Sequence, residues 1–163
     1  MGITDGGINL APDLEAKAQI LSNALEVFWA LGHEEPKVAV LSAIESVNPN
    51  LPSTVDAAEL ARRAQEGIFG SCQVAGPLAL DLAVSAESAR RKGVDTPVAG
   101  AADILLFPSI EAANIAAKTV QYMAGAEVGH VVVGASVPVL IPSRSETVQE
   151  KTNAVALGRL MVG

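Results

Sequence analysis

Residues 37–41, Lys-Val-Ala-Val-Leu (KVAVL), form a short apolar run with two β-branched valines, which indicates a buried strand. Before it, apolar residues at helical spacing and a capping residue, Asp13, predict a helix over 14–31. A second helix is expected after it, over 54–66. A buried strand between two helices is the repeating unit of a parallel α/β sheet.

The same alternation continues toward both ends of the chain. We expect further strands at 2–5, 71–75, 103–107, 130–133 and 137–141, and further helices at 85–92, 111–123 and 147–162. This order predicts an α/β sandwich with a mostly parallel sheet. Ligands of such sheets bind beyond the carboxyl ends of the strands, so we look for chemistry in the loops after Leu41, Ala75, Phe107 and Ile141.

Composition excludes several classes of function. The chain has 163 residues, of which 50% are hydrophobic, and its net charge is −7 from 11 basic and 18 acidic side chains. Such a chain is globular rather than disordered. The acidic balance argues against a nucleic-acid partner, because phosphate backbones are bound by positive surfaces. A small phosphate-bearing ligand would have to be met by a local cluster.

Cysteine and histidine usage predicts neither a disulfide nor a metal. Cys72 is the single cysteine, and His33 and His130 lack the spacing of metal ligands. A free thiol fits a reducing cytoplasm, which is the expected location. The longest uncharged run, 128–143, is too short to span a bilayer, so no membrane partner is expected.

The segment 142–150 (PSRSETVQE) follows an expected strand and opens an expected helix. An arginine, Arg144, and two serine hydroxyls stand there where backbone N–H groups point outward, which is typical of an anion site. Thr147 and Glu150 have the spacing of a helix capping box, and Ser143 and Glu146 repeat it. Spacing alone leaves both interpretations open.

Five stretches carry a family resemblance that covers nearly the whole chain from Ile3. They read ITDGGINLAPDLEAKAQI, PKVAVLSAIESVNP, VAGPLALDLAVS, PVAGAADILLFPSIEAANIAAK and LIPSRSETVQEKTNA. The chain resembles the C-terminal half of the phosphate acetyltransferase / phosphate butyryltransferase family. The forms NLAPDLEAKAQI and SRSETVQEK are more similar to the butyryltransferase branch.

The resemblance implies a fold and a reaction. The fold would be that of isocitrate and isopropylmalate dehydrogenases, with two three-layer α/β/α domains, of which this chain would be the second. The reaction would transfer an acyl group between coenzyme A, a substrate, and inorganic phosphate. It would need no cofactor and no metal, and the thiolate would attack the acyl phosphate carbonyl directly. The acyl chain length stays open.

The resemblance also assigns roles to residues. Arg144 would pair with phosphate or thiolate, and Ser143 would hydrogen-bond the oxyanion of the tetrahedral intermediate. Glu150 would help to take the thiol proton, directly or through water, although acetyltransferase members usually carry Asp there. Asp81 and Asn114 occupy family-like positions at the rim, as cleft or positioning residues.

Family members are about twice as long as this chain, and their upstream domain supplies further arginines. We therefore expect a catalytic half, with an α/β domain over 1–135 and a strand-loop-helix unit over 136–163, that has little activity alone. The alternative is a non-catalytic dimerisation or coenzyme A-binding domain, because the helix end at 27–31 is apolar all round and fits a homodimer interface. A dehydrogenase relative would need a metal-carboxylate cluster and a nucleotide loop, and neither is visible in the sequence.

Overall fold

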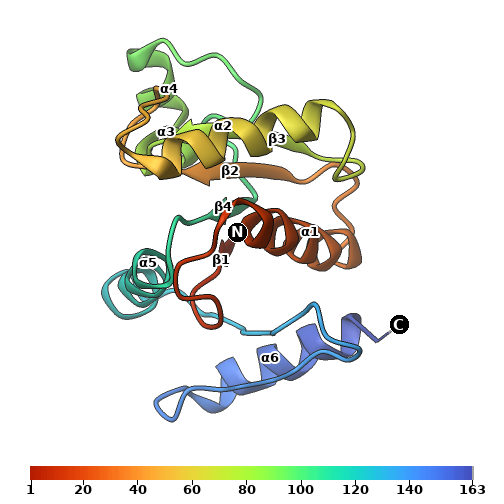
Figure 1. Cartoon of the computed structure of the whole chain (residues 1–163). Coiled ribbons are helices and arrows are strands. Elements are labelled where there is room, and N and C mark those ends of the chain that lie inside the picture. Colours follow the sequence, from red (N-terminus) through yellow and green to blue (C-terminus); the bar gives the residue numbers. More distant parts are fainter. Residues whose placement is uncertain (163) are drawn as a thin grey trace.

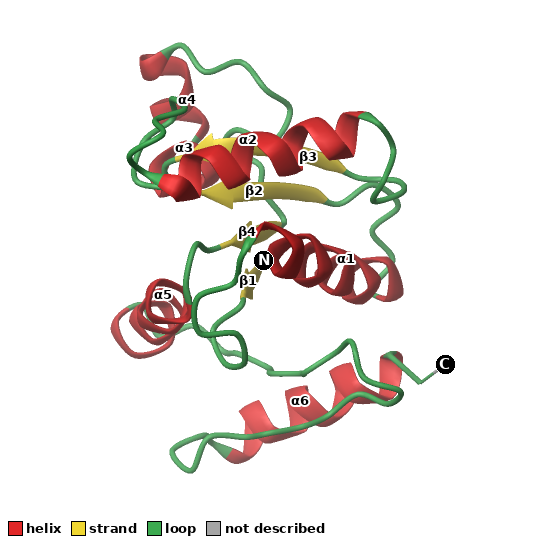
Figure 2. Ribbon diagram, viewed as in Figure 1, coloured by secondary structure: helices red, strands yellow, loops and turns green. Residues whose placement is uncertain are grey.

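The computed structural model describes residues 1–162, and strands alternate with helices along most of this length (Figures 1 and 2). In chain order the elements are β1 (Gly2–Thr4), α1 (Leu14–Ala30), β2 (Lys37–Leu41), α2 (Pro52–Gln65), β3 (Gln73–Leu78), α3 (Leu80–Val84), α4 (Ala86–Lys92), β4 (Ile104–Leu106), α5 (Ile110–Met123) and α6 (Val148–Leu160).

The four strands form one sheet in the order β1-β4-β2-β3. Every neighbouring pair is parallel, and the β2 and β3 arrows in Figure 2 point the same way. Val38 in the interior strand β2 lies opposite Val74 of β3 on one side and Ile104 of β4 on the other. The parallel sheet expected from the alternation is therefore confirmed.

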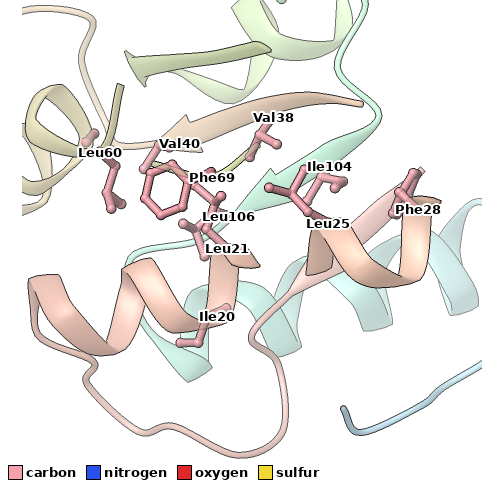
Figure 3. Close-up of a cluster of buried hydrophobic side chains, with 11 residues drawn as sticks. Ile20, Leu21, Leu25, Phe28, Val38, Val40, Leu60, Phe69, Ile104 and Leu106 are labelled. Atoms are coloured by element: carbon pink, nitrogen blue, oxygen red, sulfur yellow. The ribbon is translucent and has the colours of Figure 1, made fainter. Parts of the chain in front are cut away.

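Successive side chains of the interior strands enter two different cores, because side chains alternate across a strand. Val38 and Val40 of β2 pack with α1 and α2 on one face, and Ala39 and Leu41 pack with α3, α4 and α5 on the other. Figure 3 shows the first core, where Leu21 and other α1 side chains lie against β2 and β4. Helices on both faces give the three-layer α/β/α arrangement.

Local capping signals set the helix ends close to their expected positions. The Asp13 carboxylate accepts the Ala16 N–H at 2.9 Å and starts α1. The Ser85 hydroxyl accepts the Ser88 N–H at 3.2 Å and starts α4, which ends at Gly93 in the left-handed conformation with φ of 67°. These interactions span at most four residues, which is why the sequence indicates them directly.

Two of the expected strands are wrong. Residues 130–133 and 137–141 contribute only one isolated antiparallel bridge, between Val132 and Val139. Their apolar β-branched pattern suits a strand, but no strand of the sheet lies beside them, and Val137 is 59% exposed. Ile141 is thus not the carboxyl end of a sheet strand. Strand β3 begins two residues later and ends three residues later than the expected 71–75, and the short helix α3 was not expected at all.

Residues 126–162 form what we call the C-terminal arm, which lies below α1 and α5 in Figure 1. Within the arm, Asn153 Nδ2 of α6 donates to the Val128 carbonyl at 3.2 Å, and a Cβ on Gly158 would lie 3.1 Å from Leu140 Cδ2. The arm touches α1 where Gly134 meets the Asn23 side chain. Among the described residues, no helix is long and apolar enough to cross a membrane.

Candidate functional site

All four strands have their carboxyl ends on the same side of the sheet, and Asp5 organises the loop that follows β1 there. The Asp5 carboxylate accepts the N–H groups of Gly7 at 2.9 Å, Ile8 at 3.0 Å and Asn9 at 2.8 Å. Burial alone would raise the pKa of Asp5, but the hydrogen bonds from the Gly7 and Asn9 amides outweigh it and lower the pKa. Asp5 therefore stays ionised and holds the loop in one conformation.

Asn114 ties helix α5 to this loop. Its Nδ2 donates to the Gly6 carbonyl at 2.9 Å, which joins two segments 108 residues apart in the sequence. A Cβ on Gly6 would lie 3.4 Å from the Asn114 backbone nitrogen, so the loop and the helix are in direct contact. Asn114 therefore lies beside the loop that follows β1, and its role as a cleft or positioning residue stays a prediction.

Asp81 lies at the other end of the sheet, in the first turn of α3 directly after the edge strand β3. Its carboxylate is 3.1 Å from Lys92 Nζ, and both side chains are nearly half exposed. Such surface pairs contribute little to stability. Asp81 therefore lies at the rim, but it is far from the loop after β1, because β1 and β3 are the two outer strands of the sheet.

The loop at 142–147 leads into α6 through a complete capping box. Thr147 Oγ1 accepts the Glu150 N–H at 3.2 Å, and Glu150 Oε2 accepts the Thr147 N–H at 2.7 Å. Gln121 Nε2 of α5 donates to the other oxygen, Glu150 Oε1, at 2.6 Å. The Thr147 N–H, followed by the Gln121 amide, lowers the pKa of Glu150. A buried carboxylate with this set of donors is a weak base.

Ser143 and Glu146, which also have the spacing of a capping box, form only one of its two hydrogen bonds. Glu146 Oε1 accepts the Ser143 N–H at 2.7 Å and lies 2.8 Å from His130 Nδ1. The Ser143 hydroxyl does not return the contact and instead lies 3.0 Å from Ser145 Oγ, which is 2.9 Å from the Tyr122 hydroxyl of α5. Ser143 is therefore held through its backbone by Glu146 and through its side chain by a line of hydroxyls.

The structure gathers some of the expected site residues and separates others. Ser143, Arg144 and Glu150 lie on one loop and the helix start after it, beside the last turn of α5. Asn114 lies in the first half of α5, about 12 Å from Tyr122 at 1.5 Å per residue. Asp81 follows β3, the outer strand on the side of the sheet opposite to β1.

Sequence reasoning missed the roles of Asp5 and of the His130–Glu146 contact. Asp5 could have been found, because an acidic residue before two glycines at a strand end is typical of a turn held by a side chain. No local signal marks the His130–Glu146 contact, which spans 16 residues. Within residues 1–162, no three His, Cys, Asp or Glu side chains are arranged to hold a metal ion.

The fold and the loop together define a parallel α/β domain that carries a Ser-Arg pair at a capped helix start. Residues 1–158 match the family model described as phosphate acetyl/butaryl transferase, and the chain belongs to this family. The family resemblance inferred from the sequence is thus confirmed.

Individual relatives agree with the family assignment. The chain is 44% identical over 161 residues to a phosphate butyryltransferase of Clostridium acetobutylicum, and this match covers 99% of the chain and 54% of the relative. It is 43% identical over 158 residues to a phosphate acetyltransferase of Rhizobium meliloti, covering 97% of the chain and 50% of the relative. These nearly equal identities do not favour either acyl group.

A solved structure shows the same fold. The crystal structure of a branched-chain phosphotransacylase from Enterococcus faecalis superposes with a TM-score of 0.89 at 37% identity, covering 97% of this chain and 56% of that one. The chain therefore spans about half the length of the relatives that it matches.

Proposed function

We propose that this chain is one half of a phosphate acyltransferase, which transfers an acyl group between coenzyme A and inorganic phosphate. One observation carries the proposal beyond the family assignment. Arg62, Arg63, Arg90 and Arg91 all pair with glutamates, whereas the exposed Arg144 has no hydrogen-bond or ion-pair partner among residues 1–162. A guanidinium left free on a loop whose conformation is fixed is suited to bind phosphate.

Ser143 and Arg144 take the direct roles in this proposal. Arg144 binds the phosphate group, and Ser143 donates its hydroxyl hydrogen to the carbonyl oxygen as negative charge develops there. Coenzyme A and phosphate are both substrates, so the reaction as proposed needs no cofactor. The acyl group can be acetyl, butyryl or branched, as the names of the three relatives illustrate.

The other expected site residues support the loops. Both oxygens of Glu150 accept hydrogen bonds, and its pKa is lowered, first by the Thr147 N–H and then by the Gln121 amide. We therefore propose that Glu150 acts mainly by fixing the start of α6, with proton transfer left to a water molecule. Asn114 is proposed to position the loop after β1, and Asp81 to line the rim near β3.

We also propose that the arm is covered by a second domain, equivalent to the half of the relatives that this chain does not match. Exposed apolar residues gather there on the 137–141 segment and on α6, among them Val137, Ile141, Val148 and Val155. Exposed apolar surface of this kind marks interaction sites. The proposed boundary between 1–135 and 136–163 falls inside the arm, between the bridged residues Val132 and Val139. We accordingly expect little activity from this chain alone.

The alternative is a dimerisation module, favoured by one observation: Trp29 and Leu31 at the end of α1 are 37% and 44% exposed. A homodimer formed through this helix end would be detected by analytical ultracentrifugation, and a monomer at all concentrations would contradict it. A cytoplasmic location is also proposed, on the single free thiol, Cys72.

Acyl phosphate formation from acyl-CoA and phosphate tests the main proposal. The assay uses this chain alone and a chimera in which the chain replaces the matching segment of the Clostridium acetobutylicum relative. Arg144→Ala in the chimera should lower kcat/KM at least about 100-fold, since it removes a charged contact to the transferred group. Arg91→Ala, which removes an exposed arginine paired with Glu87, is the matched control and should have no effect. A folded but inactive chimera, or full activity of Arg144→Ala, would contradict the proposal.

A further inference from the structure

One carboxylate in the loop before α6 is buried while its neighbours are exposed. The Glu146 side chain is 1% exposed, whereas Ser143, Arg144, Ser145 and Thr147 all face solvent. Burying an ionised carboxylate is unfavourable unless donors surround it. The buried position of Glu146 therefore has to be explained by the contacts that its carboxyl group makes.

The two oxygens of the Glu146 carboxyl group differ in their contacts. Its Oε1 takes both contacts, the Ser143 N–H at 2.7 Å and His130 Nδ1 at 2.8 Å. Its Oε2 is buried with no hydrogen-bond partner among the described residues. Most buried polar atoms of proteins have a hydrogen-bond partner, so an unpartnered carboxylate oxygen calls for an explanation. The contacts that Glu146 does make connect the Ser143 backbone to the His130 imidazole.

His130 links this loop to another part of the arm. It lies 16 residues before Glu146, in the segment that α6 packs against, and its imidazole is 45% exposed. Beside Glu146, the other acidic group near the imidazole is Glu150, whose pKa is lowered first by the Thr147 N–H, then by Gln121, and also by His130. His130 and Glu146 thus form a chain of contacts from the 128–133 segment to the Ser143 backbone.

We infer that Glu146 and His130 are positioning residues for the Ser143–Arg144 pair. Glu146 fixes the backbone nitrogen of Ser143 and thereby the direction of the Ser143 hydroxyl and of the following arginine. His130 holds the carboxylate in the orientation that makes this contact. This inference deepens the proposed function and rests on it for its effect on catalysis, but its structural part can be tested without activity.

The chain contains a natural probe for the loop. Tyr122 is its single tyrosine, and the Tyr122 hydroxyl is 2.9 Å from Ser145 Oγ, which is 3.0 Å from Ser143 Oγ. Replacing it with 3-fluorotyrosine gives one ¹⁹F resonance that responds to the position of Ser143. This measurement uses the full chain and needs no substrate.

The test compares Glu146→Gln with Glu127→Gln, which makes the same chemical change at an exposed glutamate of the arm. Glu146→Gln should shift or broaden the fluorine resonance, because the neutral amide holds the Ser143 N–H and His130 more weakly. In the chimera it should lower kcat about tenfold and change KM for acyl-CoA less than twofold, since Ser143 acts on the developing oxyanion. Glu127→Gln should change none of these quantities.

His130 is tested by loss and by rescue. His130→Ala should shift the same fluorine resonance, and His130→Gln, which keeps an N–H donor for the carboxylate, should restore it. Unchanged spectra in Glu146→Gln and His130→Ala would overturn the inference. So would a loss of kcat that accompanies a lowered thermal midpoint with an unshifted resonance, because that indicates general destabilisation. If the unsubstituted chimera is inactive, the proposed function fails, while the spectra still decide the positioning role.

Discussion

The sheet with its five covering helices and the C-terminal arm use similar residues to opposite effect. In the sheet layers the apolar side chains enter two cores, and Leu21, Leu25 and Val38 are at most 1% exposed. In the arm Val137, Ile141 and Val148 are 59%, 62% and 83% exposed. Apolar residues stabilise a fold only where other elements cover them. The first region therefore has hydrophobic cores of its own, although Ile68 and Ile115 at its surface are also 61% and 65% exposed, whereas the buried apolar residues of the described arm are reduced to Ala154.

The largest effect expected from this difference comes from a matched pair of leucines. Leu21→Ala in α1 should lower the free energy of unfolding by about 3 kcal/mol, because it leaves a cavity in the first core. Leu160→Ala at the end of α6, where the side chain is 49% exposed, should stay within about 0.5 kcal/mol. Urea unfolding followed by circular dichroism measures both. Equal losses would mean that the arm is packed as tightly as the sheet layers.

A matched pair of glycines gives the next largest effect. A Cβ on Gly76 would lie 2.9 Å from Val40 Cβ and from the Val40 carbonyl oxygen, so Gly76→Ala should destabilise by roughly 1–3 kcal/mol through overpacking. A Cβ on Gly158 would meet only the flexible Leu140 side chain, at 3.1 Å. Gly158→Ala should therefore be neutral, or stabilise α6 by up to about 1 kcal/mol through helix propensity. Thermal unfolding of the two variants compares them, and a large loss in Gly158→Ala would contradict a loosely packed arm.

The smallest expected effect is a pH dependence confined to the arm. The Thr147 N–H and then the Gln121 amide hold the pKa of Glu150 below its usual value of 4.5. The stabilisation of α6 by this carboxylate is thus complete above pH 4.5 and is lost as the pH falls through the lowered pKa. Amide exchange of α6 should accelerate in that range, and Glu150→Gln should weaken the dependence. An α6 exchange rate that follows the sheet layers at every pH would show that the two regions unfold together.

The predictions from the sequence are correct where an element depends on contacts between residues close together in the chain, and they fail where it depends on distant segments. The helices that start at Asp13 and Ser85, and the capping box of Thr147 and Glu150, rest on contacts within four residues. The strand at 37–41 was also predictable, because a β-branched run buried on both faces has few alternatives. The runs at 130–133 and 137–141 are also rich in valine, but a strand requires a neighbouring strand, and composition does not say whether one is present.

The candidate site divides in the same way. Ser143, Arg144 and Glu150 are neighbours in the sequence, so the sequence places them together. The contact of His130 with Glu146 joins residues that no spacing rule connects. Asn114 and Asp81 follow different strands, and only the order β1-β4-β2-β3 places one near the β1 loop and the other at the far edge.

By itself the sequence determined the α/β class, the starts of the helices with clear capping residues, the family and the Ser-Arg loop, because these depend on local spacing and on short motifs. The tertiary structure decided the strand order, the burial of Glu146 and the exposure of the arm. The physical reason is that burial and long-range hydrogen bonds depend on which distant segments reach one another. The contact of Asn114 with Gly6, across 108 residues, is settled only when the whole chain packs.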